Sequence, residues 1–222
     1  FEVPARLMHA AGFALYEAKA KGAGSICCFD PEKYAKQKSD IENIRAFSEL
    51  LDKNLFTYHF QPIVSASTGE IVAYEALMRT KGNIALNPLQ ILNCAKNFGR
   101  LYDIEKATLK NTLKYLSKHQ LDFENRRLYI NSISSHALDD KDFYAIVNDY
   151  GELLEKVVIE MTEQTEISED DLDRIRVRLE KNNMSLAIDD YGTGYSNTSN
   201  LLRYDPEVVK IDRSLISGID QN

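Results

Sequence analysis

The order of apolar segments from residue 56 onward is the feature that most restricts the fold of this chain. Short apolar runs, rich in β-branched and aromatic residues, alternate there with longer amphipathic segments. The short runs predict strands at 57–64, 70–78, 128–132, 157–163, 185–190 and 208–212. The longer segments predict helices at 88–99, 103–119, 140–155, 168–182 and 195–203. Such alternation is typical of a parallel sheet covered on both faces, in either an α/β barrel or an open doubly wound sheet.

The first 55 residues have a different texture. Residues 4–21 carry apolar side chains at helical spacing, and residues 25–29 predict a short strand. The charged stretch that follows has Pro31 near its start and predicts a linker helix. We therefore divide the chain into an N-terminal piece (1–30), a linker helix (31–55) and a main domain (56–222).

Composition narrows the possible partners and compartments. With 34 acidic against 27 basic residues, the net charge of -7 argues against binding to long nucleic acid. The cysteines, Cys27, Cys28 and Cys94, show no metal-type pairing and suit reduced thiols. No apolar run reaches the roughly 20 residues that span a bilayer. We expect a cytoplasmic domain, although a longer parent protein could be tethered to a membrane.

Polar side chains interrupt the last five predicted strands, each within or at the end of an apolar run. They are Glu75, Asn131, Glu163, the pair Asp189 and Asp190, and Lys210. A buried charge is costly unless a partner or a metal compensates it. In α/β barrels the carboxyl ends of the strands converge on one mouth, where active sites form. The pattern therefore predicts one shared site.

Each of these residues also has a plain structural interpretation. Asp190, ahead of Tyr191-Gly192, could start a turn, and Asn131 could cap a loop. Glu75 could pair with Arg79. Similarly, Lys210 could pair with Asp212, two residues further along the same strand face. Taken together, the five strands favour a shared site over five separate structural roles.

The side-chain types indicate the chemistry of such a site. Carboxylate and amide oxygens are hard ligands that suit Mg²⁺ or Mn²⁺, whereas zinc more often takes His or Cys. The four histidines show no paired spacing. A group with this many acids can hold two cations, and two-metal sites stabilise both the attacking and the leaving oxygen in phosphoryl displacement. We therefore expect metal-assisted phosphodiester hydrolysis.

Several motifs, in order, resemble those of the EAL family of cyclic di-GMP phosphodiesterases. They are FQPI at 60–63, YEALMR at 74–79, LYIN at 128–131, IEMTE at 159–163, DDYGTGYS at 189–196 and VVKID at 208–212. The resemblance implies a TIM-like (β/α)₈ barrel that hydrolyses cyclic di-GMP to linear pGpG. A receptor that binds cyclic di-GMP without cleaving it is the competing interpretation.

Motif positions imply a role for each site residue. The implied metal ligands, for two Mg²⁺ or Mn²⁺ ions, are Glu75, Asn131, Glu163, Asp189 and Asp190. Glu75 and Asp189 would also be catalytic, together with Lys210, which would position the attacking water. The implied substrate contacts are Gln61, Leu77 and Arg79. Glu166 would anchor the loop 191–197, which the family links to homodimer formation.

The resemblance also bears on the two ends of the chain. The family pattern continues past the lysine-bearing strand, so we expect a barrel whose last two strands are absent from this chain. At the other end, AGFALYEAKAKGAGSICCFD (residues 11–30) resembles the last helix and strand of a GGDEF domain. We therefore expect an upstream GGDEF domain as a partner in the parent protein.

Overall fold

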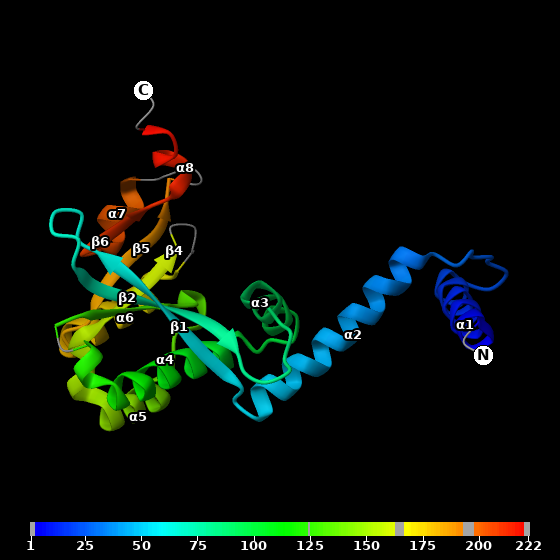
Figure 1. Cartoon of the computed structure of the whole chain (residues 1–222), viewed down its shortest axis with the longest axis horizontal. Helices are drawn as coiled ribbons and strands as arrows, with labels where there is room; N and C mark the ends of the chain where they lie inside the picture. Colours follow the sequence, from blue (N-terminus) through cyan, green and yellow to red (C-terminus); the bar gives the residue numbers. More distant parts are fainter. Residues whose placement is uncertain (1–2, 124, 163–166, 193–197, 220–222) are drawn as a thin grey trace.

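The computed structural model describes residues 3–123, 125–162, 167–192 and 198–219. Six strands form one sheet with helices packed along it, and a long helix leads away from the sheet to the N-terminal helix (Figure 1). The strands are β1 (Phe56–Val64), β2 (Ile71–Thr80), β3 (Arg127–Asn131), β4 (Val157–Thr162), β5 (Ser185–Tyr191) and β6 (Val208–Ile211). They follow one another across the sheet in chain order, and all six predicted strands are confirmed.

The helices also follow the predicted order. They are α1 (Val3–Lys21), α2 (Pro31–Asp52), α3 (Pro88–Asn97), α4 (Leu101–Lys118), α5 (Asp140–Tyr150), α6 (Glu169–Lys181), α7 (Thr198–Tyr204) and α8 (Arg213–Ile216). Short 3₁₀ turns lie at Gln120–Phe123, Ser134–His136 and Gly151–Lys156. Among the described helices, none is long and apolar enough to cross a membrane.

Local sequence signals explain where the helices begin. Asp30 caps α2 by accepting backbone hydrogen bonds, and Pro31 follows at the first helical position. Asn87 and Gln90 form a reciprocal capping box at α3. As the spacing predicted, Ser168 caps α6 by accepting the backbone N–H of Asp171.

The pairing of β1 with β2 corrects the expectation of a wholly parallel sheet. These two strands are antiparallel, whereas the pairs from β2 to β6 are parallel. Only residues 65–70 connect β1 to β2, and the backbone N–H of Ser65 donates to the Glu70 carbonyl. A parallel crossover needs a dozen or more residues, so this short connection can only close a hairpin.

The strand predicted at 25–29 is wrong, because residues 25–30 form neither helix nor strand. An isolated extended segment has no partner for its backbone, and the described chain places no strand beside it. Aromatic packing holds this connection instead. The rings of Phe13 and Tyr34 lie 5.4 Å apart, and Phe29 contacts both.

The sheet buries a different layer on each face. The larger core lies between the sheet and helices α2 to α5 and includes Phe47, Leu113, Leu128 and Leu154. A smaller apolar layer covers the opposite, inner face. Its members are Ala73, Tyr129, Val158 and Ala187, with Ile63 and Val208 packed against them. The polar residues of the candidate functional site lie next to this inner apolar layer.

Candidate functional site

The candidate site lies directly above the inner apolar layer. Side chains two positions apart on a strand share a face, so each strand adds one polar residue two positions from its inner-layer residue. On the parallel strands these residues are Glu75, Asn131, Glu160, Asp189 and Lys210. The sheet thus gathers two glutamates, an aspartate, an amide and a lysine from five neighbouring strands.

Lys210 is the centre of this group. Its Nζ lies 2.5 Å from Glu160 Oε1, 3.1 Å from Asp189 Oδ2 and 3.2 Å from Glu75 Oε2. Partial burial acts to lower the pKa of Lys210, but Glu160, Asp189 and Glu75 outweigh it and raise that pKa above its usual value. The lysine therefore remains a cation. It offsets part of the negative charge that the three acids bring together.

Glu160 is the most buried acid of the group, with only 1% of the residue exposed. Burial, with repulsion from Glu75 and Asp189, raises its pKa to about 7 against the opposing effect of Lys210. Within the described part of the chain, Oε1 pairs with the Lys210 ammonium, whereas Oε2 accepts no hydrogen bond. Buried oxygens of this kind need compensation, and a bound cation supplies it.

The donor set fits a hard divalent cation. Glu75, Glu160 and Asp189 each present a carboxylate oxygen, and these three oxygens lie within 4.8 Å of one another. Asn131 stands beside them and donates from Nδ2 to Glu75 Oε1 over 3.1 Å. Oxygen ligands in this number suit Mg²⁺ or Mn²⁺.

These contacts decide between the alternatives for Glu75 and Lys210. Glu75 pairs with Lys210, whereas Arg79 donates to the Met78 carbonyl over 2.7 Å. Asp212 caps α8 by accepting the Ser214 N–H. Both Glu75 and Lys210 therefore belong to the shared group, as the shared-site hypothesis predicts.

Asp190 lies beside the group and is not one of its three closely spaced carboxylates in the described chain. Its backbone is left-handed, with φ of 55°, which suits the start of a turn. Burial, with the charges of Asp189 and Asp212, raises the pKa of Asp190. Asp190 is thus close enough for the acids of the site to raise its pKa. Its role as a metal ligand stays a prediction.

The predicted substrate contacts share the face of the acids. Gln61 stands opposite Glu75 in the β1–β2 ladder, and opposite residues point to the same side of an antiparallel pair. Leu77 and Arg79 follow Glu75 at intervals of two along β2. All three thus share the sheet face of Glu75, and their contacts with a substrate stay a prediction.

Glu160 was not among the site residues predicted from the sequence. The predicted fourth-strand ligand was Glu163 and the predicted loop anchor was Glu166, and both lie outside the described residues. A signal for Glu160 was nevertheless present, because it is an acid two positions after Val158 inside an apolar run. Strand alternation alone would have put Glu160 on the inner face.

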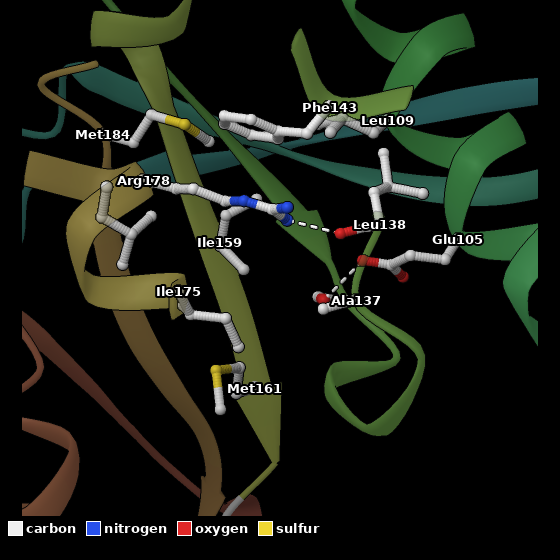
Figure 2. Close-up of a pocket in the computed structure, with 12 residues that line it drawn as sticks. Glu105, Leu109, Ala137, Leu138, Phe143, Ile159, Met161, Ile175, Arg178 and Met184 are labelled. Carbon is white, nitrogen blue, oxygen red and sulfur yellow. Dashed lines mark hydrogen bonds between the residues drawn. The ribbon is translucent and has the colours of Figure 1, made fainter. Parts of the chain in front are cut away.

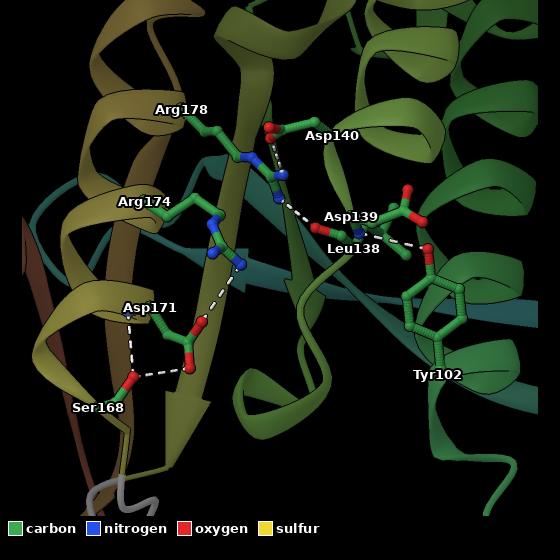
Figure 3. Close-up of polar contacts among 8 residues, drawn as sticks. All are labelled: Tyr102, Leu138, Asp139, Asp140, Ser168, Asp171, Arg174 and Arg178. Atoms are coloured by element: carbon green, nitrogen blue, oxygen red, sulfur yellow. Dashed lines mark hydrogen bonds and ion pairs between the residues drawn. The ribbon is translucent and has the colours of Figure 1, made fainter.

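The segment after Asn131 is held at both ends by buried charged side chains (Figure 2). At its start, Glu105 of α4 accepts Ser132 Oγ–H over 2.6 Å and the Ile133 N–H over 2.7 Å. At its end, Arg178 of α6 donates to the Leu138 carbonyl over 2.5 Å and to Asp140 over 2.7 Å (Figure 3). These contacts fix the backbone that carries Asn131 into the site.

Comparison of sequences identifies the family to which the motifs belong. The model of the EAL domain matches residues 44–222. The cyclic di-GMP phosphodiesterase NbdA of Pseudomonas aeruginosa is 27% identical over 226 residues, which cover 96% of this chain and 28% of NbdA. The chain spans about a third or less of the length of the first curated relatives it matches.

Comparison of structures confirms the predicted fold class. The PaMucR phosphodiesterase, solved as a c-di-GMP complex, is 23% identical with a TM-score of 0.63, over 82% of this chain and 76% of that one. BlrP1 of Klebsiella pneumoniae, solved with manganese and cy-diGMP, is 24% identical with a TM-score of 0.63, over 74% of this chain and 42% of BlrP1. The chain therefore has the barrel-type α/β fold of these proteins, with six strands of the barrel described here.

Proposed function

The chain belongs to the EAL domain family, and from that premise we propose that it is a metal-dependent phosphodiesterase that hydrolyses cyclic di-GMP to linear pGpG. One observation carries the proposal more than any other. Three carboxylates from three strands meet within 4.8 Å on one face of the sheet, with a lysine and an amide beside them. Named relatives that are cyclic di-GMP phosphodiesterases support the same substrate.

In this proposal Glu75, Glu160 and Asp189 would hold the first cation, and Asn131 would offer its amide oxygen. The proposal has two Mg²⁺ or Mn²⁺ ions, for which Asp190 and Glu163 would be further ligands. Such a metal supplies an acidified water and neutralises phosphate charge. The ammonium of Lys210 lies within hydrogen-bonding distance of three of these acids, so it can orient a water or a phosphate oxygen at the same place.

The remaining side chains of this face are proposed to position the substrate. Gln61 and Arg79 are donors for guanine or phosphate oxygens, and Leu77 between them offers an apolar contact. The anchor role of Glu166, a homodimer and an upstream GGDEF domain stay predictions of the family resemblance.

Turnover by the purified chain tests the proposal. Anion-exchange chromatography measures the conversion of cyclic di-GMP to pGpG. We expect conversion with Mn²⁺ or Mg²⁺ and no conversion with EDTA. Glu160→Gln keeps the shape of the side chain and removes its charge, and we expect at least a ~100-fold loss of rate. Glu70→Gln, in the exposed β1–β2 turn, is the matched control and should leave the rate unchanged.

Binding measured in parallel separates the two competing functions. Cyclic di-GMP that binds without being cleaved would support the receptor and contradict the enzyme. Equal loss in both glutamine variants would point to a general effect of charge rather than to the site.

A further inference from the structure

A second polar pocket lies away from the carboxylate group, between the start of β1 and the C-terminal half of α4. Its volume is about 260 Å³. Lys114 and Lys118 of α4 line one wall, and Lys81, just after β2, lines another. The backbone N–H of Lys81 donates to the Leu55 carbonyl over 2.8 Å, which fixes this residue beside the start of β1. Three exposed lysines from two separate segments therefore line one concave space.

The charge of this pocket is unusual for the chain. None of its lining residues is acidic, although the whole chain has a net charge of -7. Within the described part of the chain, none of the three lysines forms an ion pair. Some lysines elsewhere do form ion pairs, as Lys106 does with Asp142 at 2.7 Å and Lys53 with Glu49 at 2.8 Å.

Like charges at this spacing repel one another. Lys114 and Lys118 lie one turn apart on α4, and like-charge pairs at that spacing destabilise a helix. Lys81 adds a third positive charge across the pocket. An anion bound between them would turn this repulsion into attraction, whereas solvent alone only screens it.

The neutral groups of the pocket are hydrogen-bond donors. The side-chain amides of Asn54 and Asn111 donate to each other over 3.0 and 2.8 Å, and Asn111 also bonds to Tyr58, which leaves the second amide hydrogen of Asn54 for a ligand. Burial raises the pKa of Tyr58 to about 12, so its hydroxyl stays neutral and donates to Thr108. The lining thus combines cations with neutral donors and carries no negative charge.

We propose that this pocket binds a small phosphate-bearing anion of the size of phosphate or diphosphate. Its volume lies below the roughly 300–1,000 Å³ of sites that enclose drug-sized ligands, so it suits a phosphate group rather than a whole nucleotide. Lysine ammonium groups bind phosphate as point charges. The pocket is separate from the carboxylate group. Tyr58, which lines the pocket, lies opposite Met78 in the β1–β2 ladder, and Met78 is three residues beyond Glu75 on β2.

Calorimetric titration of the full chain with sodium pyrophosphate tests this site. EDTA is included so that no metal can carry pyrophosphate to the acids around Lys210. We expect one binding site per chain, weaker at higher salt. The double variant K114Q/K118Q should weaken binding by at least about tenfold, and K81Q should weaken it in the same direction.

K33Q/K36Q is the matched control, since it removes the same charge from exposed positions of α2. It should leave the affinity within about twofold of the original chain. Equal weakening in both double variants, or no binding by the unchanged chain, would overturn the proposal. Thermal unfolding of each variant verifies that the fold is kept. Because no metal and no cyclic di-GMP are present, the result is independent of the proposed phosphodiesterase activity.

Discussion

At the scale of single residues, the proposed metal site depends most on Glu160. Its carboxylate is buried among Glu75, Asp189 and Lys210, and only its Oε1 has a partner among the described residues, the Lys210 ammonium. A ligand that binds only the folded state stabilises it by mass action. Metal binding can therefore be measured as stability, without substrate and without turnover.

We predict that Mn²⁺ raises the melting temperature of the chain and that Glu160→Gln removes most of this effect. At a concentration one hundred times Kd, a single bound ion stabilises by about 2.7 kcal/mol, and a hundredfold weaker Kd lowers that value to about 0.4 kcal/mol. Differential scanning fluorimetry with and without Mn²⁺ measures the shift. An undiminished shift in Glu160→Gln, with Glu70→Gln as the control, would place the metal elsewhere.

Glu105 gives a pH-dependent prediction. Burial raises the pKa of this carboxyl above its ordinary value of 4.5, against the hydrogen bonds from Ile133 and Ser132. Between the unfolded and the folded pKa the native state binds more protons, so the stability of the original chain falls as pH rises. Glu105→Gln has no proton to lose there. We expect the variant to gain stability relative to the original chain as pH rises above about 4.5.

Urea unfolding at several pH values measures this difference for Glu105→Gln. Stability curves that run parallel across the range would show that Glu105 ionises in the native state as freely as in the unfolded one. Glu70→Gln again serves as the exposed control.

A site residue can be predicted from the sequence where it interrupts the apolar pattern around it. Glu75, Asn131, Asp189 and Lys210 interrupt or end apolar strands, and the structure brings all four together. Glu160 also interrupts an apolar strand, but the motif resemblance pointed to Glu163 as the ligand on that strand. Glu105 gives no signal in the sequence, because an acid in an amphipathic helix normally faces solvent.

At the scale of secondary-structure elements, Arg178 joins α6 to the segment after β3. Only 8% of its side chain is exposed, and its guanidinium lies 4.5 Å from the centre of the Phe143 ring. Arg174, one turn earlier on α6, makes an exposed pair with Asp171 at 3.3 Å (Figure 3). The two arginines offer a matched comparison on one helix.

We predict that Arg178→Ala destabilises the chain by about 2 kcal/mol. The variant loses the packing on Phe143 and leaves the Leu138 carbonyl without its donor. Arg174→Ala should cost less than about 0.5 kcal/mol, because exposed ion pairs contribute little. Urea unfolding of both variants gives the two values, and similar values for both would contradict the structural role of Arg178.

The elements themselves were predictable where local chemistry defines them. The cap at Ser168 located the start of α6, and apolar runs located every strand of the sheet. The direction of β1 was not predicted from its composition, since either direction buries the same side chains. It follows from the length of the 65–70 connection, a constraint that the apolar pattern does not contain.

At the scale of the whole molecule, the chain has a sheet-containing body and a helical extension (Figure 1). Helix α2 has 22 residues, about 33 Å, and only its last part enters the main core. Phe47 is 2% exposed and Leu50 is fully buried, whereas Ile41 and Ile44 remain exposed. The proposed boundary between residues 31 and 55 therefore falls within α2, near the point where its side chains begin to be buried.

We predict that a chain beginning at Asp40 melts within about 2 °C of the full chain, because none of the described residues before Ala46 belongs to the main core cluster. Phe47→Ala in the full chain should instead cost about 3–5 kcal/mol, since it removes a buried ring from that cluster. Differential scanning calorimetry compares the three proteins. If removing residues 1–39 lowers the melting temperature as much as Phe47→Ala does, α1 and the start of α2 stabilise the sheet-containing body. They would then belong to the same folding unit, and the three-part division of the chain would fail.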